Sequence, residues 1–166
     1  MEKRPKINLE LAGADKALEI VGALSVFAIW GLTIINYNSL PDIIPKHYNI
    51  AGEADSFGGK ESILILPVIS TVIFAGLTIL NKFPHIFNYQ TVITKENALR
   101  QYTNAARLIR YLKFIVVVIF GFIEFKTIQI ANGQANGLGT WFLLFTAGVV
   151  FIPLIYFSVK MVRTIQ

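Results

Sequence analysis

Four long apolar runs constrain the fold of this chain more than any other feature of its sequence. Each run is 18 to 22 residues long, and a helix needs roughly 20 apolar residues to cross the hydrocarbon core of a bilayer. Charged residues are nearly absent from them, and the exceptions are Glu19, Lys113, Glu124 and Lys126. The sequence therefore predicts an all-α integral membrane four-helix bundle, with transmembrane helices at about 18–37, 63–80, 112–131 and 138–159.

The overall composition is typical of a membrane protein. Charged residues make up 15% of the chain, whereas a soluble domain carries about a quarter. Cysteine is absent, which excludes disulfides, thiolate catalysis and cysteine-ligated metal sites. We expect a single membrane domain over residues 1–166, with the lipid bilayer as a partner, no cofactor and no catalytic residue. The oligomeric state is not predicted.

The distribution of basic residues predicts the orientation of the helices. Twelve of the 15 Lys and Arg residues lie in or beside three segments: before the first run, between the second and third, and after the fourth. Cytoplasmic flanks of membrane helices carry this kind of excess. Both termini should therefore be cytoplasmic, with the connection at 38–62 outside. No aromatic residues interleave with a basic run, so we predict no nucleic-acid partner.

The outward connection at 38–62 is the main candidate for function, because it is rich in Pro, Gly, Asn, Asp and Glu. Two four-residue stretches in it, 49–52 and 55–58, begin with Asn or Asp and end with Gly. This is the residue preference of type I turns. The sequence predicts a structured loop with two successive turns, and in the simplest interpretation Asn49 and Asp55 serve those turns alone.

The functional interpretation gives the loop a ligand-binding role. Its candidate residues are His47, Asn49, Gly52, Glu53, Asp55 and Lys60. A cation site is a weaker alternative because their spacing matches no strong metal motif, and we predict none. A membrane enzyme acting at the outer surface also stays open, since His47 could serve as a base if Asp55 or Glu53 orients it.

Glu124 is a second candidate, because an ionisable side chain inside a transmembrane helix is costly unless paired and often functional. Its expected partners are Asn36 in the first helix, Thr140, or water entering from outside. Lys126 lies about 200° away around the helix and is not a natural partner. Glu124 either packs the bundle in protonated form or supports an ion or proton role in a small transporter or channel component.

The inward connection is expected to contain an amphipathic segment at 82–111. Thr94 is a predicted N-cap for a helix that continues into the third transmembrane helix. Apolar residues recur at helical spacing on one side of it: Leu99, Tyr102, Ala106 and Ile109. Arg100, Arg107 and Arg110 are expected largely elsewhere around the helix. They would contact anionic headgroups or dock a cytoplasmic partner.

The loop also carries a recognisable pattern. The run Leu40-Pro41-x-x-Ile44-Pro45-x-His47-Tyr48-Asn49-x-x-Gly52-x-x-Asp55-x-x-Gly58-x-Lys60 resembles the LPxxIPxHFNxxGxxDxxGxK signature of the bacterial membrane family called domain of unknown function 1648. Tyr48 stands where Phe is commoner. The resemblance covers about 18–81 and fades in the last two helices.

Similar loops occur at the front of SdpI-like immunity proteins, which protect a bacterium from a secreted peptide toxin and can relay its presence to a repressor. Those proteins usually carry additional helices after this domain. The resemblance implies a non-enzymatic binding, immunity or signalling protein of a bacterial cytoplasmic membrane, facing an extracellular peptide or envelope ligand.

Overall fold

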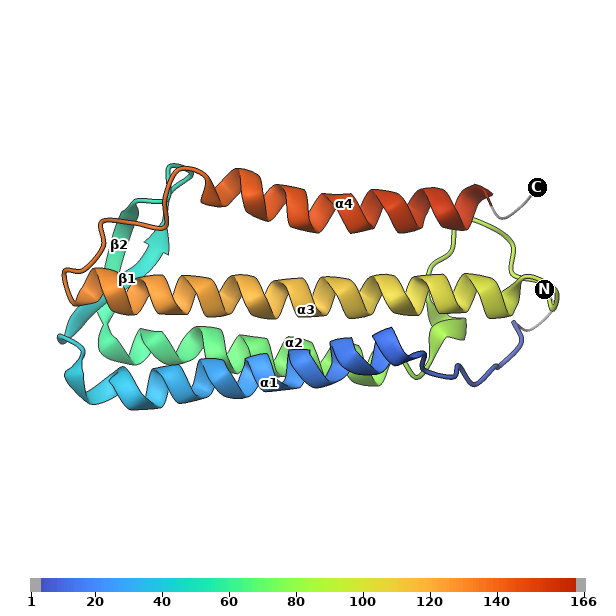
Figure 1. Ribbon diagram of the computed structural model, residues 1–166, viewed down its shortest axis with the longest axis horizontal. Coiled ribbons are helices and arrows are strands. Elements are labelled where there is room, and N and C mark those ends of the chain that lie inside the picture. Colours follow the sequence, from blue (N-terminus) through green and yellow to red (C-terminus); the bar gives the residue numbers. More distant parts are fainter. Residues whose placement is uncertain (1–3, 164–166) are drawn as a thin grey trace.

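The computed structural model describes residues 4–163 of the chain. Within this range, four helices are long and apolar enough to cross a membrane. They run side by side along the long axis of the molecule, and a small β-hairpin lies at one end (Figure 1). The predicted fold class is confirmed: the chain is a helical multi-pass membrane protein. The bounds are α1 Gly13–Asn36, α2 Ile65–Leu80, α3 Ala98–Ala131 and α4 Phe142–Arg163.

The two ends of the bundle differ, and we name them here. The hairpin end holds the connection between α1 and α2 and the connection between α3 and α4. The terminal end holds residues 4 to 12, the connection between α2 and α3, and the end of α4 (Figure 1). Residues 4 to 12 are irregular, and the first helix begins at Gly13.

Helix α3 is the axis of the fold. Its 34 residues span about 50 Å, well beyond the roughly 30 Å of a bilayer core. The amphipathic helix predicted before the third span is therefore continuous with it, as expected. The N-cap of α3 is Asn97, so the cap predicted at Thr94 lies about one turn too early. Thr94 closes the preceding turn: the Asn97 amide donates to Thr94 Oγ1 at 3.4 Å, and the Thr94 amide donates to Asn97 Oδ1 at 2.9 Å.

The other three helices pack around α3, with α1 and α2 on one side and α4 on the other (Figure 1). Two apolar clusters fill the contacts. One lies under the hairpin and contains Leu40, Ile44, Ile63 and Ile128; the other lies farther along the bundle and contains Val26, Ile29 and Val117. The surfaces of α1, α2 and α4 remain largely apolar and exposed, as lipid-facing surfaces are.

The connection between α1 and α2 forms an antiparallel hairpin, with β1 at Ile43–Tyr48 and β2 at Ala54–Gly59. The first predicted turn is present, since the Gly52 amide donates to the Asn49 carbonyl at 2.9 Å. The second predicted turn, at 55–58, is wrong, because those residues pair along β1. Pairing with a neighbouring strand satisfies their backbone groups, which overrides the local turn preference.

Candidate functional site

His47 and Asp55 face each other across the hairpin. His47 Nδ1 lies 2.6 Å from Asp55 Oδ1, and the histidine side chain is 68% exposed. Strand pairing brings the two residues together, since His47 pairs with Ser56, the neighbour of Asp55. The structure therefore joins two of the predicted site residues and fixes the orientation of the imidazole.

Asn49 and Glu53 hold the turn between the strands. Asn49 Oδ1 accepts hydrogen bonds from the Ala51 amide at 2.9 Å and the Glu53 amide at 3.0 Å. Its side-chain amide donates to Glu53 Oε2 at 3.2 Å. Both residues thus shape the loop, as the simplest interpretation of Asn49 predicted.

Gly52 docks the hairpin onto the connection between α3 and α4. Its φ is +79°, a conformation that residues with a Cβ rarely adopt. The Gly52 carbonyl accepts a hydrogen bond from the Leu138 amide at 2.7 Å, and Glu53 forms a β-bridge with Gly137. A Cβ on Gly52 would lie 2.8 Å from the Gly139 carbonyl oxygen. The close approach of the two connections therefore requires glycine at this position.

Lys60 lies apart from the other predicted loop residues. Its Nζ is 3.6 Å from Asp42 Oδ1, and its amide donates to the Asp42 carbonyl at 3.0 Å. These contacts close the base of the hairpin where η2, Lys60–Leu64, begins. Within residues 4–163, no group of three or more His, Asp or Glu side chains is arranged to hold a metal ion.

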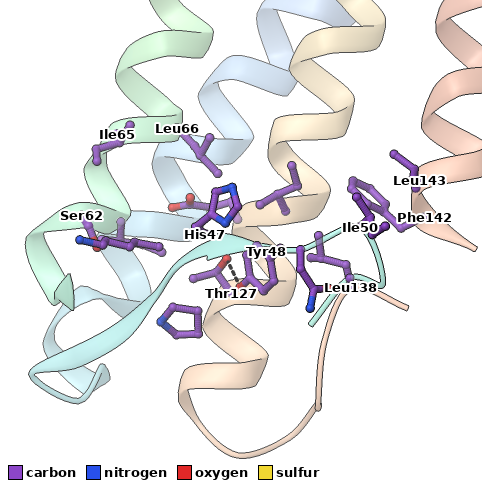
Figure 2. A pocket seen from close by; sticks show the side chains of 17 residues that line it. His47, Tyr48, Ile50, Ser62, Ile65, Leu66, Thr127, Leu138, Phe142 and Leu143 are labelled. Atoms are coloured by element: carbon purple, nitrogen blue, oxygen red, sulfur yellow. Dashed lines mark hydrogen bonds between the residues drawn. The ribbon is translucent and has the colours of Figure 1, made fainter. Parts of the chain in front are cut away.

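A cavity of about 390 Å³ opens beside the hairpin, within the roughly 300–1,000 Å³ of small-ligand sites. One wall is β1 with its turn, and the others come from the start of α2, from α3 and from the start of α4. Figure 2 shows side chains from these elements pointing toward one another, and most are apolar: Ile50, Ile65, Leu66, Leu138, Phe142 and Leu143. His47, Asn49 and Gly52 also line it.

Glu124 is the buried acid of this cavity. Its side chain has no exposed surface, and Thr33 Oγ1 donates to its Oε1 at 2.5 Å. Its Oε2 has no hydrogen-bond partner. The predicted partner, Asn36, instead donates to the Leu32 carbonyl of its own helix at 2.8 Å. The sequence correctly placed the partner on α1, but the partner is Thr33, about one turn before Asn36.

Thr127 and Tyr48 complete the polar part of the cavity, and sequence reasoning missed both. Their hydroxyl oxygens are 2.8 Å apart, joining α3 to β1 (Figure 2). Thr127 stands three residues after Glu124, a spacing that puts both on one helix face and could have revealed it. Burial raises the pKa of Tyr48 above its usual value, the hydrogen bond with Thr127 opposes this, and Glu124 adds to it.

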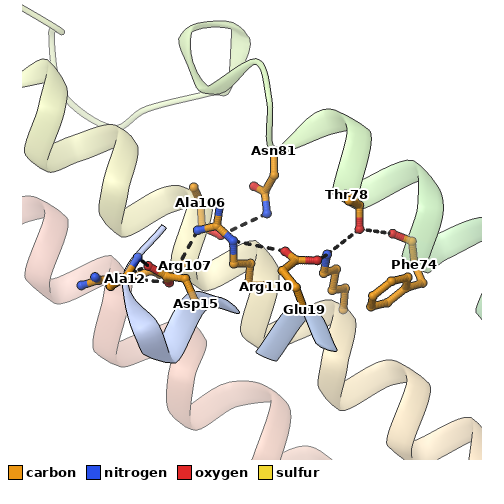
Figure 3. A network of polar contacts seen from close by, with 10 residues as sticks. Ala12, Asp15, Glu19, Phe74, Thr78, Asn81, Ala106, Arg107 and Arg110 are labelled. Atoms are coloured by element: carbon orange, nitrogen blue, oxygen red, sulfur yellow. Dashed lines mark hydrogen bonds and ion pairs between the residues drawn. The ribbon is translucent and has the colours of Figure 1, made fainter. Parts of the chain in front are cut away.

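A second buried polar group, which we call the ion-pair cluster, lies toward the terminal end. It joins two acids of α1 to three bases of α3: Asp15, Glu19, Arg107, Arg110 and Lys113 (Figure 3). Arg110 Nε is 3.2 Å from Glu19 Oε1, and Lys113 Nζ is 2.5 Å from Glu19 Oε2. Lys113 also donates to Thr78 Oγ1 at 2.5 Å.

The cluster corrects the prediction for the amphipathic segment. Tyr102 and Ala106 are buried as expected, but Leu99 of the same predicted face is exposed and Arg110 is buried. Arg107 contacts Asp15 at 3.2 Å. These cations therefore pair inside the bundle, because each has a carboxylate of α1 to compensate the cost of its burial. A cytoplasmic partner at 82–111 stays a prediction.

Comparison with known proteins identifies one domain. Residues 24–71 match the family described as Domain of unknown function (DUF1648), so the resemblance predicted from the loop is confirmed. The match runs from α1 through the hairpin into α2. Two further helices that are long and apolar enough to cross a membrane follow the matched segment.

An uncharacterized protein of Archaeoglobus fulgidus is 24% identical over 116 residues. This match covers 65% of the present chain and 63% of the relative, which is less than two thirds of the relative's length. No solved structure matches the chain.

Proposed function

We propose that this chain is a non-enzymatic binding protein that recognises an extracellular peptide or envelope component at the hairpin end, in an immunity or signalling role like that of SdpI-like proteins. The observation that carries the proposal is the cavity of about 390 Å³ beside the hairpin. Its walls come from segments far apart in the chain, and its surface combines apolar side chains with a buried carboxyl group. This combination suits an apolar ligand with one polar group.

The orientation belongs to the proposal. The hairpin end would face outward and the terminal end the cytoplasm of a bacterial cytoplasmic membrane. The support is the number of basic residues, since twelve of 15 lie in or beside the sequence segments before α1, between α2 and α3 and at the end of α4, and the rule counts Lys and Arg rather than net charge. A ligand from outside would then reach the cavity without crossing the bilayer.

Deletion of the gene in the native host, followed by challenge with a panel of peptide toxins, tests the role. We expect increased sensitivity to at least one peptide. A chromosomal Leu66→Trp variant, which fills the cavity, should reproduce the deletion. Val68→Trp on the exposed face of α2 is the matched control and should behave as wild type. Unchanged sensitivity in the deletion strain across a broad panel would count against the proposal.

An enzyme acting at the outer surface is the second candidate, and the 2.6 Å contact between His47 and Asp55 favours it. A carboxylate on Nδ1 orients a histidine so that its other nitrogen serves as a base, and His47 lines the cavity. Purified protein incubated with fluorogenic peptides and esters tests this. Turnover lost in His47→Ala and reduced in Asp55→Asn would support it, and equal background rates in all three proteins would remove it.

A transporter or channel role for Glu124 has less support. The apolar side chains of Val26, Ile29 and Val117 form a cluster, and Val117 lies between Lys113 and Glu124 in the sequence of α3. A proteoliposome flux assay that compares wild type with Glu124→Gln decides the point. Equal or absent flux in both would exclude the role.

A further inference from the structure

The unpartnered oxygen of Glu124 points to the chemistry of the ligand. The carboxyl group is fully buried, and its Oε2 has no hydrogen bond. Its Oε1 depends on Thr33, whose hydroxyl oxygen also lies 2.9 Å from the Ile29 carbonyl. A hydroxyl has a single proton to donate, so even this contact is shared. A buried polar group left in this state is destabilising.

No neighbouring cation compensates Glu124 among residues 4–163. The ion pairs in this range involve other acids. Lys46 and His47 line the cavity, but both are exposed at its rim, and His47 is bound to Asp55. The cavity thus has a negative or acceptor group in its wall, and its other walls are mainly apolar.

We propose that the cavity takes a ligand with an apolar body and a primary amine, with the ammonium group bonded to Glu124 Oε2. This inference rests on the proposed ligand-binding function of the same cavity. An ammonium has three donors and no acceptor. Glu124 supplies the free acceptor, and the hydroxyl oxygens of Thr127 and Tyr48, which line the same cavity, supply further acceptors. A carboxylate ligand of the same length has no proton to donate to these acceptors.

The absence of cysteine from the chain allows a direct test by thiol labelling. The probes are hexylamine, 1-hexanol and hexanoate, which share one apolar chain and differ in the end group. The reporter is Leu143→Cys, in the cavity wall, and its matched control is Leu144→Cys, the more exposed neighbour outside the cavity. Labelling by a maleimide is measured in nanodiscs, with and without Glu124→Gln.

We expect hexylamine to protect Leu143→Cys at a concentration about tenfold or more below that of hexanol, because hydrogen bonds to charged groups are the stronger kind. Hexanoate should protect least, and Leu144→Cys should report only partition of each probe into lipid. Glu124→Gln should remove the preference for the amine while protection by hexanol persists, which shows that the cavity is still formed.

Two results overturn the inference, and they are distinguishable. Equal protection by all three probes, or an amine preference that survives Glu124→Gln, leaves a binding cavity without the proposed amine site. No protection of Leu143→Cys by any probe, beyond that seen at Leu144→Cys, counts against ligand binding in this cavity and so against the proposed function as well.

Discussion

The ion-pair cluster and Glu124 both place buried charged side chains on α3, and they differ in how completely these are satisfied. In the ion-pair cluster, Lys113 has no exposed surface, yet it contacts Glu19, Thr78 and the face of the Phe74 ring. At the hairpin end, Glu124 is equally buried, yet one of its oxygens has no partner. The first arrangement uses its charges to hold helices together, and the second keeps an acceptor available.

The difference shows that burial alone does not separate structural from functional charges in a membrane bundle. Lys113 and Glu124 are eleven residues apart on α3, or about 16 Å along its axis, and Val117 fills the space between them. Substitutions that remove one charge from each group should therefore have unequal effects on stability.

The largest effect is expected from Lys113→Met, because it leaves Glu19 with a partly uncompensated charge and removes the bond to Thr78. We expect a loss of about 2 kcal/mol in the free energy of unfolding, measured by SDS titration of mixed micelles. Glu19→Gln combined with Lys113→Met should recover part of the loss. Lys126→Met, elsewhere on α3, should stay within about 0.5 kcal/mol. A comparable loss in Lys126→Met would show that the ion pairs of Lys113 are not the cause of the loss.

Gly52→Ala should cost about 1 to 2 kcal/mol, because the backbone at φ +79° is strained by a Cβ and that Cβ approaches the Gly139 carbonyl. Hydrogen exchange of the Leu138 amide, which bonds to Gly52, should become faster. Gly133→Ala is the matched control, since its φ is +71° but nothing lies within 4 Å of the added Cβ. If both variants leave Leu138 equally protected, the docking does not depend on Gly52.

Tyr48→Phe should cost about 1 kcal/mol, the value of one hydrogen bond, here the bond to Thr127. Burial raises the pKa of Tyr48 in the folded state. Its stabilisation is therefore complete below the unfolded pKa of about 10 and is lost as the pH rises through the folded pKa. The difference in phenolate absorbance between wild type and Tyr48→Phe isolates the titration of Tyr48, and its midpoint should lie above pH 10. A difference curve centred at or below that pH would contradict the burial of this phenol.

The smallest effect is expected from Glu124→Met, the counterpart of Lys113→Met. The substitution removes an incompletely satisfied group, and Thr33 keeps its bond to the Ile29 carbonyl. The free energy of unfolding should change by less than about 1 kcal/mol in either direction, in the same SDS titration. A loss as large as that of Lys113→Met would mean that Glu124 is a structural residue.

The sequence predicted the helices well because their signal is local. Apolar runs of sufficient length identify membrane spans without knowledge of tertiary contacts, whereas the start of α3 was predicted about one turn too early, at Thr94. The hairpin was missed because Pro41, Pro45 and the glycines at 58 and 59 weaken the strand pattern. Pro45 lies beside an irregularity in the pairing, where a strand tolerates it.

The site was predicted in part for a similar reason. Glu124 stood out as an acid in an apolar run, and His47 and Asn49 stood out in the loop. Thr33 and the members of the ion-pair cluster were missed, because their partners are about 90 residues away and a single sequence does not show such pairs. The spacing of Asp15 and Glu19, four residues apart on one helix face, was the available signal.

The same separation has a consequence for biogenesis. Glu19 is synthesised 91 residues before Arg110 and 94 before Lys113, which at roughly 5–20 residues per second is a delay of about 5 to 20 s. During this time the acids of α1 still lack their bases, because α3 has not yet been synthesised. Helix α1 can therefore reach its final packed position only after α3 has been inserted. Chains truncated before Arg107 should be targets for membrane quality control.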